Sequence, residues 1–265
     1  MLLIIEALLL ILATLGQDHR TAVEGQIFPL DMALNSVDDQ YKGCNLKMAY
    51  CVITKYLKEE LNKSPDFRNA WNQAKKNVTR SLNIFSRFRK MAIWVYTDPI
   101  SKIYIKLNND TRNGKQTYTA KTYKWYSLHF LLTDAIQSLK KKNQCYTTYR
   151  GTNVKFNVPD FTAVRFGSFT STTVYAGRAQ GFGNVTCFVI HTCEGADIAN
   201  YSRLPFEGEV LIPPYETFSV TVVKNIKPNL KCQTMFELKS TGIRSDLNCA
   251  LFKKPTKTKK CMFCP

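Results

Sequence analysis

Three short segments in the second half of the chain carry the side chains best suited to chemistry. They are Tyr149-Arg150-Gly151, the Ser/Thr-rich run 169–173, and residues 206–214, in which Glu207-Gly208-Glu209 precedes an apolar run. An arginine is a permanently charged, forked donor suited to phosphate. Two carboxylates two residues apart in an extended segment point to the same side. Taken singly, the segments also fit a surface ion pair, a polar strand face and two solvated carboxylates, so only their combination indicates a site.

The order and spacing of these segments resemble the R-S-E-x-E signature of the vertebrate ecto-ADP-ribosyltransferases, the arginine-specific mono-ADP-ribosyltransferase family. The four signature residues are Arg150, Ser171, Glu207 and Glu209. Other stretches that look like family sequence extend the resemblance over about residues 28–251; they are Asp31-Met32-Ala33, residues 36–41 with Cys44, Tyr96-Thr97 and residues 209–218. The resemblance implies an enzyme, an NAD–protein-arginine ADP-ribosyltransferase.

The resemblance also implies a role for each signature residue toward NAD, the expected co-substrate. Glu209 is expected to hydrogen-bond the ribose and to stabilise the positive charge that forms on the sugar as nicotinamide leaves. Arg150 is expected to hold the phosphates, and the backbone of Gly151 to approach the nicotinamide amide because no side chain intervenes. Ser171 is expected to orient Glu209. No metal is expected.

Glu207 is expected to serve the second substrate. A guanidinium with a pKa above about 12 is no nucleophile until a carboxylate binds it and helps to remove a proton. In the family, the first Glu of E-x-E goes with arginine as acceptor, so arginine-containing proteins are the expected partners. Tyr96 and Ser202 resemble further NAD-contacting positions; the alternatives are a buried strand tyrosine and a serine that belongs to a glycan sequon.

The periodicity of the sequence predicts the elements that position these residues. Apolar residues recur every three or four positions over residues 45–81, with a break at Pro65-Asp66, and again over residues 125–139. These patterns predict helices, the last of them with lysines 140–142 in its final turn. The apolar run 91–96 predicts a buried strand. Beyond Asn143, β-branched and aromatic runs predict strands at residues 146–150, 168–172, 185–192, 209–212, 218–224 and 235–240.

Helices come first and strands second, so the predicted fold class is α+β. The resemblance implies a helical N-terminal part packed on a mainly antiparallel, two-sheet NAD-binding core. The expected organisation is a signal peptide at residues 1–16, a single catalytic domain at 17–251 and a basic tail at 252–265. Within the domain, the helical part is expected at about 31–142 and the strand-rich core at about 143–251.

The ends of the chain and its cysteines indicate export. The apolar run 1–15 suits a secretory signal, although Glu6 interrupts it and no Lys or Arg precedes it. Nine cysteines are typical of a secreted protein with disulfides. The C-terminus carries five lysines and no apolar tail, so we expect a secreted, extracellular protein without a lipid anchor. The N-x-S/T sequons, which are glycan acceptors in an exported chain, are at Asn62, Asn77, Asn109, Asn184 and Asn200.

The cysteine pairing is fixed only in part. By resemblance, the expected disulfides are Cys44 with Cys249 and Cys145 with Cys193. Five cysteines remain unassigned, with Cys51–Cys232 as one option, and the odd count leaves at least one thiol over. Cys261 and Cys264 form a CxxC pair without a second pair or a neighbouring histidine, which favours a disulfide over zinc.

The resemblance and the composition together leave three functions open. The chain has 37 Lys and Arg against 20 Asp and Glu, a net charge of +17, and its 45% hydrophobic content is that of a globular protein. The leading function is mono-ADP-ribosylation of arginines on extracellular or cell-surface proteins. The alternatives are an NAD glycohydrolase and a non-catalytic, cationic secreted protein that binds polyanions or acidic membrane surfaces through its Lys-rich tail, unless that tail is only solvated. No nucleic-acid-binding module accompanies the charge, so no specific nucleic acid is expected as a partner.

Overall fold

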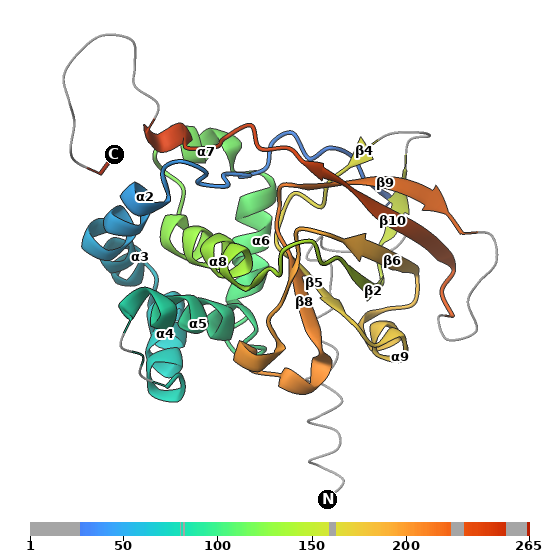
Figure 1. Cartoon of the computed structure of the whole chain (residues 1–265), viewed down its shortest axis with the longest axis horizontal. Coiled ribbons are helices and arrows are strands. Elements are labelled where there is room, and N and C mark those ends of the chain that lie inside the picture. The colour runs from blue at the N-terminus through green and yellow to red at the C-terminus, as the bar shows by residue number, and fades with distance from the viewer. Residues whose placement is uncertain (1–26, 80, 82, 159–162, 224–230, 253–263) are drawn as a thin grey trace, which may run out of the picture.

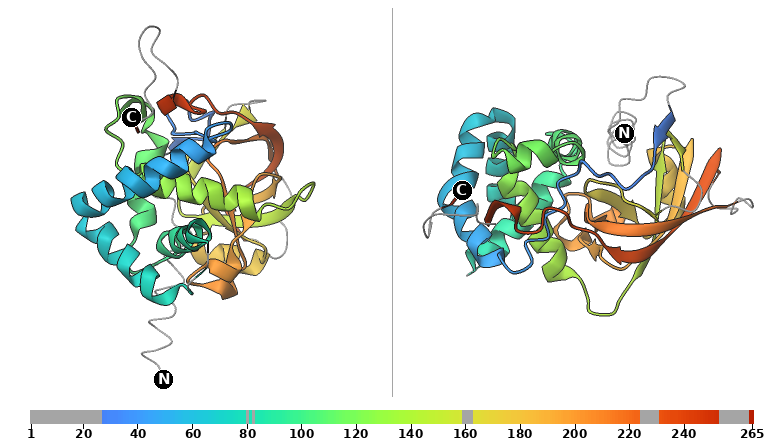
Figure 2. Two further views of the ribbon diagram at one scale, coloured as in Figure 1. Left: turned by 60° about the vertical axis from the view of Figure 1, so that its left-hand side comes forward. Right: turned by 90° about the horizontal axis from the view of Figure 1, so that it is seen from above.

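The computed structural model describes residues 27–79, 81, 83–158, 163–223, 231–252 and 264–265. The expected signal peptide and residues 253–263 of the expected basic tail lie outside these ranges. Within them, no helix is both long and apolar enough to cross a membrane. Helices group on one side of the molecule and strands on the other (Figure 1, Figure 2).

The helical half surrounds one helix that is buried on every side. In chain order its elements are α2 (Asn45–Cys51), the π-helical η1 (Val52–Tyr56), α3 (Leu57–Lys63), α4 (Pro65–Asn77), α5 (Ile84–Tyr96), α6 (Ile103–Arg112), α7 (Lys115–Thr119) and α8 (Tyr126–Leu139). Every residue from Tyr126 to Ile136 of α8 is buried. Helices α2, α3 and α5 contact α8, and so does strand β7 (Ala196–Asp197). Helix α8 therefore joins the helical half to the sheet.

The predicted break at residues 65–66 is confirmed and has a local cause. Ser64 is extended, and its side chain accepts a hydrogen bond of 3.3 Å from the backbone N–H of Phe67. Pro65 occupies the first turn of α4, where its missing N–H is not needed. Ser64 and Pro65 together end α3 and start α4.

The strand predicted at residues 91–96 is wrong, because these six residues form the end of helix α5. All six are buried. Helix α5 contacts α4, α6, α8 and the 3-10 turn η3 (Ala199–Tyr201), so this stretch is covered on every side. A continuous apolar run fits a buried strand and a buried helix equally well, and only tertiary packing distinguishes them.

The lysines predicted for the last turn of α8 lie just beyond it. The helix ends at Leu139, and Lys140 leaves the helical conformation with φ −58° and ψ 125°. The Lys140 ammonium pairs with the carboxylate of Glu194 at 2.6 Å, next to the sheet. This lysine therefore acts in an ion pair rather than within the helix end.

The strand-rich half contains an eight-stranded sheet in the order β4-β9-β10-β6-β2-β5-β8-β7 and a parallel pair, β1-β3. The strands are β1 (Ile27–Pro29), β2 (Tyr146–Thr152), β3 (Lys155–Asn157), β4 (Ala163–Val164), β5 (Thr170–Thr173), β6 (Thr186–Thr192), β7, β8 (Glu209–Ile212), β9 (Glu216–Val222) and β10 (Thr234–Ile243). All six predicted strands are present. Only β6 and β10 pair in parallel within the large sheet, which confirms the α+β, mostly antiparallel prediction.

Strands β2 and β5 join the two parts of the large sheet through one registered residue pair, Tyr149 with Thr173. On either side of this joint the pairing is longer: seven residues between β2 and β6, and four between β5 and β8. The joint is where the predicted site residues of β2, β5 and β8 come together.

Four disulfides tie the described chain. Cys44–Cys249 and Cys145–Cys193 are confirmed; the other two are Cys51–Cys264 and Cys187–Cys232. The Cys51–Cys232 option is therefore wrong, and Cys264 of the CxxC pair is disulfide-bonded as favoured. Its neighbour Cys261 lies outside the described residues. Bridges that close loops of this length stabilise a fold by about 2–5 kcal/mol each.

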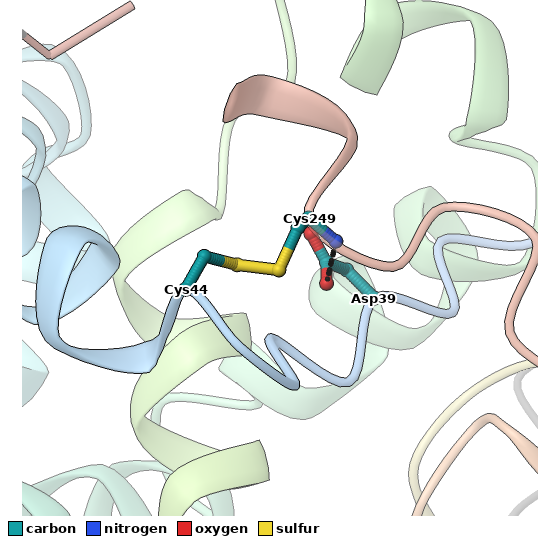
Figure 3. Close-up of side chains that lie close together, drawn as sticks. All are labelled: Asp39, Cys44 and Cys249. Carbon is teal, nitrogen blue, oxygen red and sulfur yellow. Dashed lines mark hydrogen bonds between the residues drawn. A yellow bond between two sulfur atoms is a disulfide. The ribbon is translucent and has the colours of Figure 1, made fainter. Parts of the chain in front are cut away.

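An acidic pair fixes the C-terminal segment beside the start of the domain. Asp38 forms a buried salt bridge of 2.6 Å with Arg165 and accepts the backbone N–H of Leu247 at 2.9 Å. Asp39 accepts the backbone N–H of Cys249, also at 2.9 Å, beside the Cys44–Cys249 disulfide (Figure 3). Because the two sulfurs are bonded to each other, this cluster offers no thiolate to a metal.

Candidate active site

The four signature residues come from four different elements and meet in one pocket. Arg150 lies on β2, Ser171 on β5, and Glu209 begins β8, while Glu207 ends the 3-10 turn η4 (Pro205–Glu207). The side chains lining the pocket are Tyr149, Arg150, Ser171, Thr172, Thr173, Phe182, Glu207 and Glu209. The sequence predicted half of these lining residues.

Glu207 and Glu209 face the same pocket, but not because the segment is extended. Gly208 between them adopts the left-handed conformation, with φ 58° and ψ 50°. A β-carbon at this position would lie 2.5 Å from the exposed ring of Tyr175, which would have to shift, and the left-handed conformation itself favours glycine. The turn, rather than the strand alternation predicted from sequence, brings the two carboxylates together.

Both carboxyl groups are buried and only partly satisfied. Glu207 is 3% exposed and Glu209 is 2% exposed, and in each the Oε1 atom has no hydrogen-bond partner among the described residues. Burial, followed by the charge of Glu209, raises the pKa of Glu207 to about 8. Burial also raises the pKa of Glu209 to about 7. Because neighbouring carboxyl groups titrate as a pair, the site holds fewer than two negative charges at neutral pH.

Arg150 is anchored across the joint of the sheet. Its Nη1 donates to the backbone carbonyl of Ser171 at 2.8 Å, and the side chain is buried. The guanidinium is one of the groups that lower the pKa of Glu209, so it lies close enough to act on that carboxylate. This arrangement fixes a permanent positive charge on the pocket wall.

Tyr96 reaches the site from helix α5 and not from a strand. Its hydroxyl donates to the carbonyl of Phe169 and accepts from the amide of Asn108, both at 3.1 Å. The hydroxyl oxygen of Ser171 lies 3.5 Å from it. Tyr96 is therefore buried behind Ser171 and holds that serine in place.

Ser202 contacts one of the carboxylates directly. Its hydroxyl donates to Oε2 of Glu209 at 3.5 Å and accepts the backbone N–H of Leu204 at 3.1 Å. Hydrogen bonds from Ser171 and Ser202 both lower the pKa of Glu209, against the effect of burial. Ser202 therefore helps to stabilise the ionised form of Glu209.

Gly151 is required by packing within the protein. A β-carbon there would lie 2.2 Å from the carbonyl oxygen of Ala179 and 2.3 Å from that of Gly183. These atoms belong to the segment that contains α9 (Ala176–Ala179) and η2 (Gln180–Phe182). The absence of a side chain thus lets this segment lie against β2, a reason that sequence reasoning missed.

Two aromatic pocket residues had no role assigned to them from sequence, although Tyr149 lies in the first of the three segments. Tyr149 and Phe182 line the pocket, and both are flat rings suited to stacking on a heteroaromatic ligand. The cavity between the walls is only about 10 Å³, so a nicotinamide ring enters only if a wall side chain moves. Cavities of about 770 and 730 Å³ lie on the helical half, and none of the predicted site residues lines them.

Comparisons with known proteins agree with this fold and identify the family. The family model for NAD:arginine ADP-ribosyltransferase matches residues 30–242. NAD(P)(+)--arginine ADP-ribosyltransferase 1 of Gallus gallus is 34% identical over 84% of this chain and 73% of its own length. Ecto-ADP-ribosyltransferase 5 of Homo sapiens is 33% identical to this chain, over 81% of this chain and 79% of its own length. The chain therefore belongs to the NAD:arginine ADP-ribosyltransferase family, and it is an enzyme of that class.

Solved structures extend the agreement to three dimensions. The crystal structure of the eucaryotic mono-ADP-ribosyltransferase ART2.2 has a TM-score of 0.72 and 31% identity to this chain, covering 85% of this chain and all of its own. Mutants of ART2.2 have been solved in complex with NADH and with NAD. The helical part and the mixed sheet described above are thus those of the ADP-ribosyltransferase fold.

Proposed function

We propose that this protein transfers ADP-ribose from NAD to arginine side chains of extracellular or cell-surface proteins and releases nicotinamide. The observation that carries this function is the pair of buried carboxylates, each with an unpartnered oxygen, beside a buried arginine in one pocket. Four disulfides and relatives named as ecto-enzymes support an extracellular location.

The residues of the pocket fit a dinucleotide such as NAD. Arg150 supplies the fixed positive charge that suits the diphosphate. Tyr149 and Phe182 supply apolar, flat walls for nicotinamide. The free Oε1 of Glu209 supplies a buried acceptor, which a ribose hydroxyl can satisfy. Among the described side chains that line the pocket, Glu207 is the other one with a buried acceptor oxygen that has no hydrogen-bond partner.

Glu209 acts on the sugar. When the bond between nicotinamide and ribose breaks, positive charge develops on the ribose, and a buried carboxylate stabilises that charge more strongly than water does. Ser171, Ser202 and Arg150 favour the ionised form of Glu209 that this role needs. Tyr96, through Ser171, keeps that arrangement in position.

Glu207 acts on the acceptor. A buried carboxylate with a free oxygen binds a guanidinium, and its pKa of about 8 lies near neutral pH, where a general base works best. Binding of the cationic acceptor favours the ionised carboxylate and then places it against the N–H that must lose a proton. Glu209 thus acts on NAD, and Glu207 acts on the acceptor.

The experiment is an assay of purified protein with NAD and agmatine, in which ADP-ribosyl-agmatine and free ADP-ribose are both quantified. We expect Glu209→Ala to lose both products, by about 10²-fold or more. Glu207→Gln should lose the agmatine product and keep NAD cleavage, because only the acceptor side is changed. Glu59→Gln, at an exposed site on α3, is the matched control. Equal transfer by Glu209→Ala would refute the mechanism.

The same assay separates the alternatives. A wild-type protein that yields only free ADP-ribose is an NAD glycohydrolase. A protein with no NAD turnover that binds heparin fits the polyanion-binding alternative, whose Lys-rich segment lies mostly outside the described residues. The five sequon asparagines are all exposed, as glycan acceptors must be; mass spectrometry of the secreted protein would show which carry glycans.

A further inference from the structure

An arginine of the protein itself lies against two aromatic rings next to the turn that carries Glu207 and Glu209. The guanidinium carbon of Arg178, on α9, is 4.9 Å from the centre of the Tyr175 ring and 5.5 Å from that of Phe206. Both rings are unusually exposed for aromatic side chains, at 51% and 43%. A cation held against two exposed rings is a recognised mode of guanidinium binding.

This aromatic pair is built into the turn that carries the catalytic carboxylates. Phe206 directly precedes Glu207 in η4. The ring of Tyr175 lies over Gly208, where a β-carbon would come within 2.5 Å of it. The two rings therefore lie next to the turn Glu207-Gly208-Glu209, and the guanidinium of Arg178 contacts both of them.

Electrostatics agree with this placement. Arg178 is the positive group that lowers the pKa of Glu207, against burial and the charge of Glu209. Neither Glu207 nor Arg178 has a salt-bridge partner within 4 Å in the part of the chain that the structure describes. Arg178 thus acts on Glu207 through space and without a close ion pair, so it can be displaced.

We infer that Arg178 is a resident guanidinium that occupies the acceptor subsite formed by Tyr175, Phe206 and Glu207, and that an incoming arginine must displace it. The inference rests on the proposed function and extends it to acceptor choice. Arg178 and an acceptor arginine carry the same group, so they compete for the same rings and the same carboxylate. Arg178 is in this sense a specificity-determining residue.

Competition of this kind selects among acceptors. The apparent affinity for an acceptor falls by the fraction of molecules in which the subsite is open. A small guanidine such as agmatine shows the full loss of apparent affinity, whereas a protein acceptor offsets that loss with contacts outside the subsite. Arg178 should therefore favour arginines in folded proteins over free guanidines.

The test compares wild type, Arg178→Ala and the control Arg68→Ala. Arg68 is an exposed arginine on α4, in the helical half and far from Arg178 in sequence. With agmatine, Arg178→Ala should lower the acceptor KM about fivefold, the factor expected when two exposed cation–π contacts are removed. The KM for NAD should stay unchanged. The activity profile should also move to higher pH, because the cation that lowers the pKa of Glu207 is gone.

A second variant tests the rings themselves. In the Arg178→Ala background, Phe206→Leu keeps an apolar side chain without a π face, so it should raise the agmatine KM again. An agmatine KM that is unchanged or higher in Arg178→Ala would overturn the inference, because Arg178 would then be inert or would support acceptor binding.

Failure of the proposed function gives a different result. A wild-type protein that forms no ADP-ribosyl-agmatine refutes the function, whereas calorimetric titration of agmatine into wild type and Arg178→Ala still measures the competition. Tighter agmatine binding by the variant supports the inference, and equal or weaker binding overturns it.

Discussion

Replacing Glu60 by glutamine should change how the stability of the protein depends on pH. Glu60 lies on α3 and is only 7% exposed. Its carboxylate accepts hydrogen bonds from the hydroxyl and from the backbone N–H of Ser127, the latter at 3.0 Å, in the first turn of α8. These bonds lower the pKa, but burial has the larger effect and raises it to about 8, against an ordinary value of 4.5.

The raised pKa of Glu60 means that the protein loses stability as pH rises. The folded state holds the proton more tightly than the unfolded state, so the contribution of Glu60 to stability is greatest below pH 4.5 and falls as pH rises to about 8. At about 1.4 kcal/mol per pH unit, the wild type loses about 4 kcal/mol between pH 5 and pH 8 through this one group. The glutamine of the Glu60→Gln variant is neutral throughout and would lose nothing over that range.

Thermal unfolding measures the difference. One kcal/mol shifts Tm by about 2–4 °C in a protein of this size, so the Tm of Glu60→Gln relative to wild type should rise by about 10 °C from pH 5 to pH 8. Other buried groups titrate equally in both proteins and cancel in the comparison. At pH 5 the variant should be less stable by about 1 kcal/mol, because one acceptor oxygen toward Ser127 is lost.

Glu59→Gln, the exposed neighbour, should follow the wild-type Tm at every pH. If the Tm difference between Glu60→Gln and wild type is the same at pH 5 and pH 8, then Glu60 is ionised in the folded state over the whole range. Burial would then not be the larger effect on the pKa of Glu60.

Three further predictions concern the site and the disulfides. Agmatine transfer at saturating NAD should rise from pH 6 to about 8, because burial raises the pKa values of Glu207 and Glu209 and both are needed ionised; a falling rate would contradict the assignment. Gly151→Ala should lower Tm and raise the KM for NAD, at a cost of about 1–3 kcal/mol for overpacking against two backbone carbonyls, whereas Gly177→Ala, which meets open space, should do neither. Cys264→Ser should lose about 2–4 kcal/mol of stability but keep full activity; a parallel loss of activity would show that this bridge also supports the site.

The sequence predicted those parts of the fold that show a regular pattern. The helices at residues 45–77 and 126–139 have one apolar stripe or a long buried run, and the six predicted strands are bounded by turn residues. Helix α6 carries buried polar residues such as Asn108 and Thr111 in its core-facing surface, so its apolar period is weak. The run 91–96 has no period at all. The run 91–96 was therefore assigned wrongly and α6 was not assigned at all, because tertiary packing and not local pattern decides the structure of both.

The residues of the candidate site were predictable from sequence, but their geometry was not. The resemblance selected Arg150, Ser171, Glu207 and Glu209, and the structure brings all four into one pocket. The left-handed turn at Gly208 was not predictable, because a single glycine in an E-G-E segment fits an extended strand equally well. Phe182 and Arg178 lie between Ser171 and Glu207 in sequence but outside the signature, so no motif pointed to them.

Two disulfides hold the C-terminal segment at both of its ends. Cys249 is bonded to Cys44 and Cys264 to Cys51, and these two partners flank helix α2. The chain between them contains five lysines, the residue type after which trypsin-like proteases cleave unless proline follows. A single cut in this stretch breaks the backbone without releasing a fragment, because both new ends stay bonded to the domain through sulfur. Cleaved and intact protein would therefore migrate together on a gel until a reductant is added.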